Sequence, residues 1–199
     1  MCQNSLNWKD RSALDIGKLE MRIPVEEIDY YRRKYSGYSY EERVESSLKT
    51  QIQDRFKQGK YFLTRELFLG IANWKTPRQR KNYEKNSSLL VAEVSRISFE
   101  DGRNEKIRIE ILTLLDGVNY PVASTLLHFA FPNQYPILDF RTIWSLGLEK
   151  PSFYSFNFWW NFVEMMRKAS VRLGISIRDL DKALWAYSKE NQKTDRNKG

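Results

Sequence analysis

The chain has 199 residues, of which 41% are hydrophobic and 14% aromatic, enough to bury the core of one or at most two compact domains. Its single cysteine excludes a disulfide framework and a four-cysteine iron–sulfur site, and no cluster of histidine and cysteine offers metal ligands. No metal or other cofactor is therefore predicted. The net charge of +8 favours a polyanionic partner.

The charge is clustered, which strengthens the expectation of a polyanion. Basic residues gather at 32–34, at 75–85 and at 189–198, and we expect the last part, 191–199, to be a polar disordered tail. The first twelve residues have no apolar segment of signal-peptide length, and no apolar run approaches the ~18 residues of a membrane helix. A cytoplasmic protein with no membrane partner is expected.

Apolar residues recur at helical spacing along the whole chain, which predicts an all-α fold. The expected helices cover 25–35, 41–58, 63–74, a short basic helix from Pro77, 87–98, 103–115, a helix from Pro121, a short helix from Asp139 to Gly147, 153–173 and 176–190. Three of the predicted apolar faces are Leu90, Val94 and Ile97; Ile107, Ile111, Leu114 and Leu115; and Phe153, Phe156, Trp160, Val163 and Met166.

The stretch 112–141 carries the most specific pattern. An apolar helix is interrupted at Asp116–Tyr120 by a turn, and a second apolar helix follows. Gly117 can adopt a positive φ without steric cost, and Pro121 suits the first turn of a helix because its missing N–H would be unpaired there. Such a turn leaves backbone amides exposed at a helix N-terminus, where they bind anions.

This pattern resembles the hairpin of the helix-hairpin-helix DNA glycosylases, the HhH-GPD superfamily. The residues that match the hairpin motif are Leu115, Gly117, Val118, Asn119 and Ala123, with Asn119 in place of a glycine. Asp139 lies eighteen residues beyond Pro121, the separation that the family keeps between the lysine of its bifunctional members and its catalytic aspartate. The run 135–139 looks like the adenine-mismatch branch. The resemblance covers about 30 of the 199 residues.

The resemblance implies a two-lobed helical fold with a cleft between the lobes. Here residues 1–190 would form one unit, with the hairpin at 103–131 and the catalytic-loop region at 132–147. Asp139 would be the catalytic carboxylate. Because Pro121 replaces the lysine of bifunctional members, no amine is available at that position for a Schiff base, and base excision without AP-lyase activity is expected.

Two sets of further site residues are predicted. The turn and nearby basic side chains would contact DNA phosphates, and one face of the second hairpin helix, with Trp74, would line the pocket for a flipped base. The predicted DNA contacts are Gly117, Val118, Asn119, Arg141, Lys75 and Arg78. The predicted pocket residues are Trp74, Pro121, Thr125 and His128.

Breaking an N-glycosidic bond develops positive charge on the sugar, so an ionised carboxylate beside C1′ stabilises the transition state. The sequence therefore favours a monomeric, monofunctional DNA glycosylase that acts on duplex DNA with a damaged or modified base. The main alternative is a non-catalytic helix-hairpin-helix DNA-binding protein, in which Asp139 only caps the following helix. An RNA-binding helical protein is a third possibility, and His128 also fits a buried polar role between helices.

Overall fold

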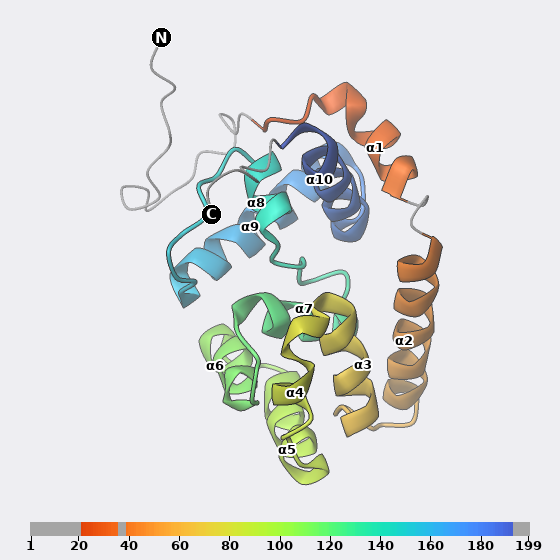
Figure 1. The fold of residues 1–199 in the computed structure, drawn as a ribbon, viewed down its shortest axis with the longest axis vertical. Coiled ribbons are helices and arrows are strands. Elements are labelled where there is room, and N and C mark those ends of the chain that lie inside the picture. The colour runs from red at the N-terminus through yellow and green to blue at the C-terminus, as the bar shows by residue number, and fades with distance from the viewer. Residues whose placement is uncertain (1–20, 36–38, 193–199) are drawn as a thin grey trace.

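The structure, a computed structural model, describes residues 21–35 and 39–192. These residues form helices and loops without a β-strand, which confirms the all-α prediction (Figure 1). Most of the predicted polar tail, 193–199, lies outside the described residues.

Ten α-helices and three short 3-10 helices make up this part of the chain. The α-helices are α1 Ile28–Tyr35, α2 Ser39–Lys57, α3 Arg65–Lys75, α4 Arg80–Tyr83, α5 Ser88–Phe99, α6 Glu105–Glu110, α7 Tyr120–Ala130, α8 Phe140–Ser145, α9 Phe156–Leu173 and α10 Ile177–Asn191. The 3-10 helices are η3 Val25–Glu27, η4 Pro77–Gln79 and η5 Ile111–Leu114.

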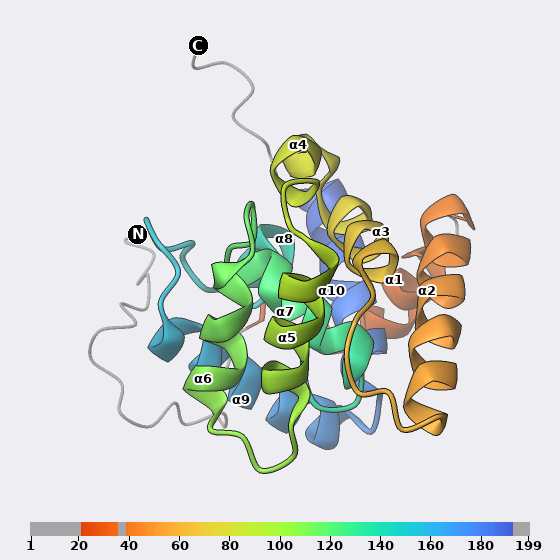
Figure 2. The same ribbon diagram turned by 90° about the horizontal axis from the view of Figure 1, so that it is seen from below.

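The helices pack in two neighbouring groups around one continuous apolar core. At one end of the molecule α10 packs against α1, α8 and α9 (Figure 1). At the other end α3 packs against α7, while α5 packs against α6 and η5. Helix α2 runs along one edge beside α3 (Figure 2). The loop from 131 to 139 leads from α7 into α8, so it joins the two groups.

In two helices, the predicted apolar face differs from the face that the structure buries. Leu90 is 41% exposed and Ile107 is 46% exposed, whereas the buried face of α5 includes Ser95 and Ser98. The Ser95 hydroxyl accepts from the Leu63 amide at 2.9 Å, so a small polar residue occupies the helix interface that apolar periodicity alone would assign elsewhere.

The second error has a different cause. From Ile111 the chain continues as a 3-10 helix, which has about three residues per turn instead of 3.6. The change of period turns Leu112 and Leu115 into the core and leaves Leu114 65% exposed. The predicted face of 103–115 assumed one continuous α-helix. The tightening accounts for Leu114, whereas Ile107 is exposed within α6 itself, whose buried residues are Arg108 and Ile109.

Helix α9 begins later than predicted, at Phe156. The Ser155 side chain accepts from the Phe158 amide and caps the helix there. Phe153 therefore lies before the helix and is 73% exposed, while Val163 and Met166 are buried as expected.

Candidate functional site

A small pocket lies where α1, α3 and α10 meet the loop that enters α8. Its volume is about 140 Å³. The side chains that line it are Tyr35, Trp74, Lys75, Ile137, Asp139, Arg178, Asp181 and Trp185. The volume is below the roughly 300–1,000 Å³ of pockets for drug-sized ligands, so the pocket suits a small group such as a single ring.

Asp139 enters this pocket because its backbone is fixed on both sides. Before it, the Leu138 amide donates to Ser124 Oγ at 2.9 Å, and both residues are buried. After it, α8 begins, and Asp139 Oδ1 caps that helix by accepting from the Arg141 amide at 2.9 Å. The second oxygen, Oδ2, accepts from Lys75 Nζ at 2.7 Å. The carboxylate therefore both caps a helix and lines a pocket.

The Lys75–Asp139 ion pair is largely shielded from solvent, with the two side chains 11% and 18% exposed. Burial alone would raise the pKa of Asp139. The charge and hydrogen bond of Lys75, helped by the Arg141 amide, outweigh burial and hold this pKa below its usual value. The carboxylate is therefore ionised at neutral pH.

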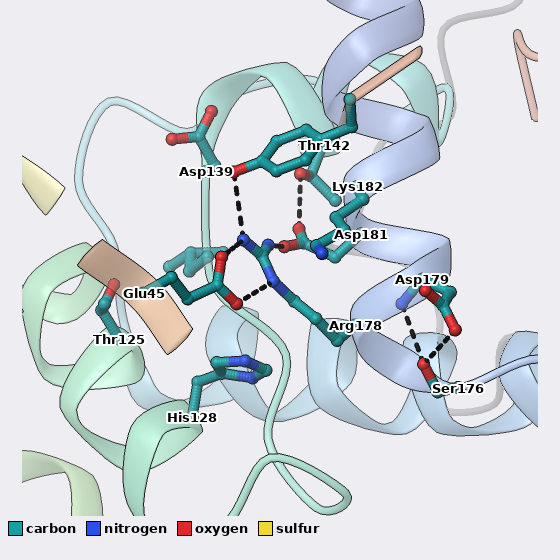
Figure 3. A network of polar contacts seen from close by, with 12 residues as sticks. Glu45, Thr125, His128, Asp139, Thr142, Ser176, Arg178, Asp179, Asp181 and Lys182 are labelled. Carbon is teal, nitrogen blue, oxygen red and sulfur yellow. Dashed lines mark hydrogen bonds and ion pairs between the residues drawn. The ribbon is translucent and has the colours of Figure 1, made fainter. Parts of the chain in front are cut away.

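Arg178 forms the centre of a buried ionic network beside this pair (Figure 3). Its Nε donates to Glu45 Oε1 at 2.8 Å and its NH2 group to Glu45 Oε2 at 2.5 Å. The same guanidinium pairs with Asp181 and donates to the Tyr35 hydroxyl at 3.1 Å. The network ties α1 and α2 to α10, since its members come from those three helices.

Burial and pairing act in opposite directions within this network. Burial would raise the pKa of Glu45, but Arg178 and Lys49 lower it to about 2. Burial raises the pKa of Asp181 despite its pairing with Arg178 and with Thr142, whose hydroxyl donates to Asp181 Oδ1 at 2.9 Å. Glu45 is therefore the more strongly ionised of the two carboxylates.

Three aromatic side chains form walls of the pocket. The guanidinium carbon of Arg178 lies 5.2 Å from the ring centre of Tyr35 and 5.7 Å from that of Trp74. The guanidinium of Arg141 lies 5.6 Å from the Trp185 ring. Such cation–π contacts hold flat surfaces around a carboxylate, an arrangement suited to a planar or cationic ligand.

The predicted turn is present, with Gly117 at a φ of 82° and α7 beginning at Tyr120. A Cβ at Gly117 would lie 2.9 Å from the ring of Tyr83, so both the backbone angle and the close packing require glycine. The Asn119 side chain caps α7 by accepting from the Val122 amide. Among the described residues, no group accepts from the amides of Gly117 or Asn119.

A second side chain clamps the turn from the loop that follows α4. Asn86 Oδ1 accepts from the Asp116 amide at 2.8 Å, and Asn86 Nδ2 donates to the Asp116 carbonyl at 3.1 Å. The turn thus lies against the segment that carries the exposed basic residues Arg78, Arg80, Lys81 and Lys85. Arg80 pairs with Glu84 at 2.8 Å. The structure therefore brings the hairpin and one predicted basic cluster together.

Only Trp74 of the predicted base-pocket residues lines the pocket. Pro121 does not line it, and Thr125 and His128 are fully buried, so that part of the prediction is wrong. The Thr125 hydroxyl donates to the Pro121 carbonyl at 2.8 Å within α7. His128 Nδ1 lies 2.8 Å from the Tyr135 carbonyl. The face of α7 that they share packs into the core, and does not form a wall of the pocket.

His128 has an unusual environment for a titratable group. Its Nε2 atom is buried without a hydrogen-bond partner among the described residues. Burial, together with the charges of Lys49 and Arg178, moves the pKa of His128 well below its usual value. In Figure 3, Glu45 and Arg178 lie between His128 and Asp139.

Two of the predicted phosphate contacts are not on an open surface. Lys75 points into the pocket and pairs with Asp139. Arg141 is half-buried, with its guanidinium 5.0 Å from the Phe140 ring and its NH1 group buried without a partner among the described residues. Arg78 is exposed.

The sequence interpretation missed most of the polar pocket residues. Arg178 and Asp181 lie on the same face of α10 as the buried Ile177, Leu180 and Leu184. Charged residues on an apolar helix face need a buried partner, and this is the pattern that could have identified them. Glu45, the partner of Arg178, is 133 residues away, so only the pairing of Arg178 with Asp181, three residues later, had a local pattern.

Comparison with protein-family models, curated proteins and solved structures gave no match for the chain. In the described ranges, no group of three or more histidine, cysteine, aspartate or glutamate side chains is arranged to hold a metal ion. No helix in the same ranges combines the length and apolar character that crossing a membrane requires.

Proposed function

We propose that this chain is a monofunctional DNA glycosylase of the helix-hairpin-helix type, which hydrolyses the N-glycosidic bond of a damaged or modified base in duplex DNA. The observation that carries the proposal is the position of Asp139. Its ionised carboxylate lines a small pocket with walls formed by Tyr35, Trp74 and Trp185. A carboxylate in a partly dehydrated site stabilises a developing cation more strongly than it would in water.

In this proposal each part of the site has a separate role. A base that leaves the helical stack would enter the aromatic pocket, and Asp139 would lie beside its sugar and orient the attacking water. The amides of Gly117 and Asn119, with exposed Arg78 and Lys81, would hold the phosphates of the same duplex. The two groups of helices would form the lobes on either side of the bound DNA.

Hydrolysis without an amine intermediate fits the surroundings of the carboxylate. Pro121 has no side-chain amine, and the Lys75 amine is held in an ion pair with Asp139. An amine held in an ion pair is a poor nucleophile, so water is the expected attacking group.

A non-catalytic DNA-binding protein is the second candidate, and one observation favours it. Each carboxylate oxygen of Asp139 already has a donor, the Arg141 amide on Oδ1 and Lys75 on Oδ2. An aspartate whose structural role is to cap α8 and to pair with α3 would have the same contacts. The two candidates therefore differ in whether the Lys75 contact is released when DNA binds.

A panel of duplexes separates the candidates. Each duplex would carry one alkylated, oxidised, deaminated or mismatched base, and alkali would cleave any abasic site after incubation with the protein. We expect alkali-dependent cleavage at one class of base and no strand breaks before alkali. Binding without cleavage across the panel would instead support the non-catalytic candidate, and absence of any duplex binding would contradict both.

A further inference from the structure

The charged side chains around the pocket form two sets. One is the network centred on Arg178, and the other is the single ion pair Lys75–Asp139. Glu45 pairs with Arg178 at 2.5 Å and with Lys49 at 2.6 Å. Asp181 pairs with Arg178 as well. These two carboxylates and two cations balance one another. The charge of Asp139 is then balanced by Lys75, whose ammonium lies 2.7 Å from Oδ2. If Lys75 moved away, the Asp139 carboxylate would face the pocket without an ion-pair partner, and the positive charge of Arg141 would still act on it.

Lys75 is held far less firmly than Arg178. The guanidinium of Arg178 is fixed by hydrogen bonds to Glu45, Asp181 and Tyr35. The Lys75 ammonium donates a hydrogen bond to Asp139. Lys75 is the last residue of α3, and a lysine side chain has four flexible carbons through which its ammonium can swing without moving the backbone. The ammonium can therefore leave while the rest of the network stays in place.

The space that the ammonium would vacate suits another cation. The rings of Tyr35, Trp74 and Trp185 line this space and already lie against protein cations, namely Arg178, Lys182, Arg141 and Lys189. The attraction for a further cation therefore comes from the negative charge of Asp139. Two cations next to a single carboxylate repel each other in a partly buried site, so a positively charged ligand and the Lys75 ammonium compete for the same oxygen.

We propose that the pocket is a binding site for a small organic monocation, and that the Lys75 ammonium is its resting occupant, which such a ligand displaces. The inference rests on the proposed function for the identity of the natural cation, which would be the positively charged sugar of the transition state. The exchange itself depends on the Lys75–Asp139 pair and does not require DNA. In the free protein, Lys75 thereby occupies the site and lowers the affinity of the site for other cations.

The test compares two duplexes that differ in one charge. One carries a protonated pyrrolidine ring in place of a single deoxyribose, and the other carries a neutral tetrahydrofuran ring at that position. The quantity measured is the ratio of their dissociation constants for the parent, Lys75→Met and Asp139→Asn. We expect Lys75→Met to prefer the cationic duplex at least about tenfold more than the parent does, which corresponds to ~1.4 kcal/mol. Asp139→Asn should lose the preference.

A matched control removes a lysine of similar burial from another ion pair. Lys182 is 16% exposed and pairs with Glu42 at 2.8 Å, and its ammonium lies 5.4 Å from the ring centre of the pocket residue Tyr35, so it tests whether the loss of any nearby positive charge has the same effect. Lys182→Met should leave the ratio close to that of the parent. Should Lys75→Met fail to fold, Lys75→Gln removes the same charge and keeps a polar end. An unchanged or lower ratio in a folded Lys75 variant would overturn the exchange.

A measurement without DNA keeps this inference separate from the proposed function. Free pyrrolidinium chloride would be titrated at constant ionic strength, with the fluorescence of the tryptophans that line the pocket as the readout. Tighter binding by the Lys75 variant than by the parent supports the cation site, even where no duplex binds and the glycosylase proposal fails. Equal binding by both proteins would contradict the exchange, whatever the DNA experiments give.

Discussion

Substitution of Arg178 by methionine tests the buried network that shapes the pocket. The change keeps an aliphatic side chain of similar length and removes the charge. It leaves Glu45 and Asp181, whose side chains are 3% and 4% exposed, without their shared cation. Glu45 keeps its contact with Lys49 at 2.6 Å, and Asp181 keeps that with Thr142 at 2.9 Å.

The expected loss of stability is about 3–5 kcal/mol, the usual cost of removing one partner from a buried ion pair. The pKa of Glu45 leads to a similar value, since a fall from 4.5 to about 2 corresponds to about 3 kcal/mol at neutral pH. Because the folded-state pKa is the lower one, this contribution is complete above pH ~4.5 and is lost as the pH falls towards about 2. The penalty of Arg178→Met should therefore stay constant from pH 7 to about 4.5 and shrink as the pH falls from about 4.5 towards 2.

Urea unfolding followed by far-ultraviolet circular dichroism measures this penalty. The double variant Glu45→Gln/Arg178→Met should be less destabilised than the sum of the single variants, by at least ~1 kcal/mol, because the first change removes a charge that the second leaves unpaired. A loss under ~1 kcal/mol for Arg178→Met, or additive effects in the double variant, would refute the reasoning.

The further predictions concern His128 and the hairpin turn. The pKa of His128 lies well below its unfolded value of 6.5, so the unfolded chain binds a proton that the folded chain does not, and stability should fall by about 1.4 kcal/mol per pH unit below pH 6.5. Urea unfolding between pH 7 and 5 should show this slope in the parent and lose it in His128→Gln. Gly117→Ala should lose at least about 1–2 kcal/mol in the same assay, because the φ of 82° is unfavourable for alanine and its Cβ meets Tyr83. In fluorescence anisotropy titrations, Gly117→Asp should weaken duplex binding. The affinity of the parent protein for the duplex should fall steeply as the salt concentration rises. A folded Gly117→Asp protein that binds normally would exclude the turn as the DNA anchor.

The features that the sequence predicted well depend on neighbours in the chain. The turn at 116–119 follows from the backbone freedom of Gly117, and α7 begins where Asn119 caps it. Asp139 was identified by its spacing from the hairpin, and Trp74 by its place at the end of an apolar helix before basic residues. Both lie in the pocket. Nearby residues were enough to identify these positions, although distant contacts also hold them: Asn86 bonds to Asp116, and Lys75 pairs with Asp139.

The features that the sequence missed depend on contacts between distant segments. Lys75 was assigned to a phosphate because charge alone cannot reveal that its ammonium meets Asp139, 64 residues later. Arg178 was not selected, since its partners belong to α1, α2 and its own helix. The face of α7 that contains Thr125 and His128 was assigned to the pocket although it is packed in the core. Apolar periodicity shows which helix faces are covered, but not whether protein or a ligand covers them.

The most direct test of the proposed glycosylase is the excision rate of Asp139→Asn on whichever modified duplex the parent cleaves. Asparagine keeps an oxygen that can accept from the Arg141 amide and cap α8, while the negative charge is lost. Asp54→Asn, at an exposed position of α2, serves as the control. Single-turnover excision by Asp139→Asn should fall by roughly two or more orders of magnitude, for a group supplying ~3 kcal/mol, with duplex affinity and folding close to those of the parent. A folded Asp139→Asn protein that excises the base at the parental rate would contradict the assignment of Asp139 as the catalytic carboxylate.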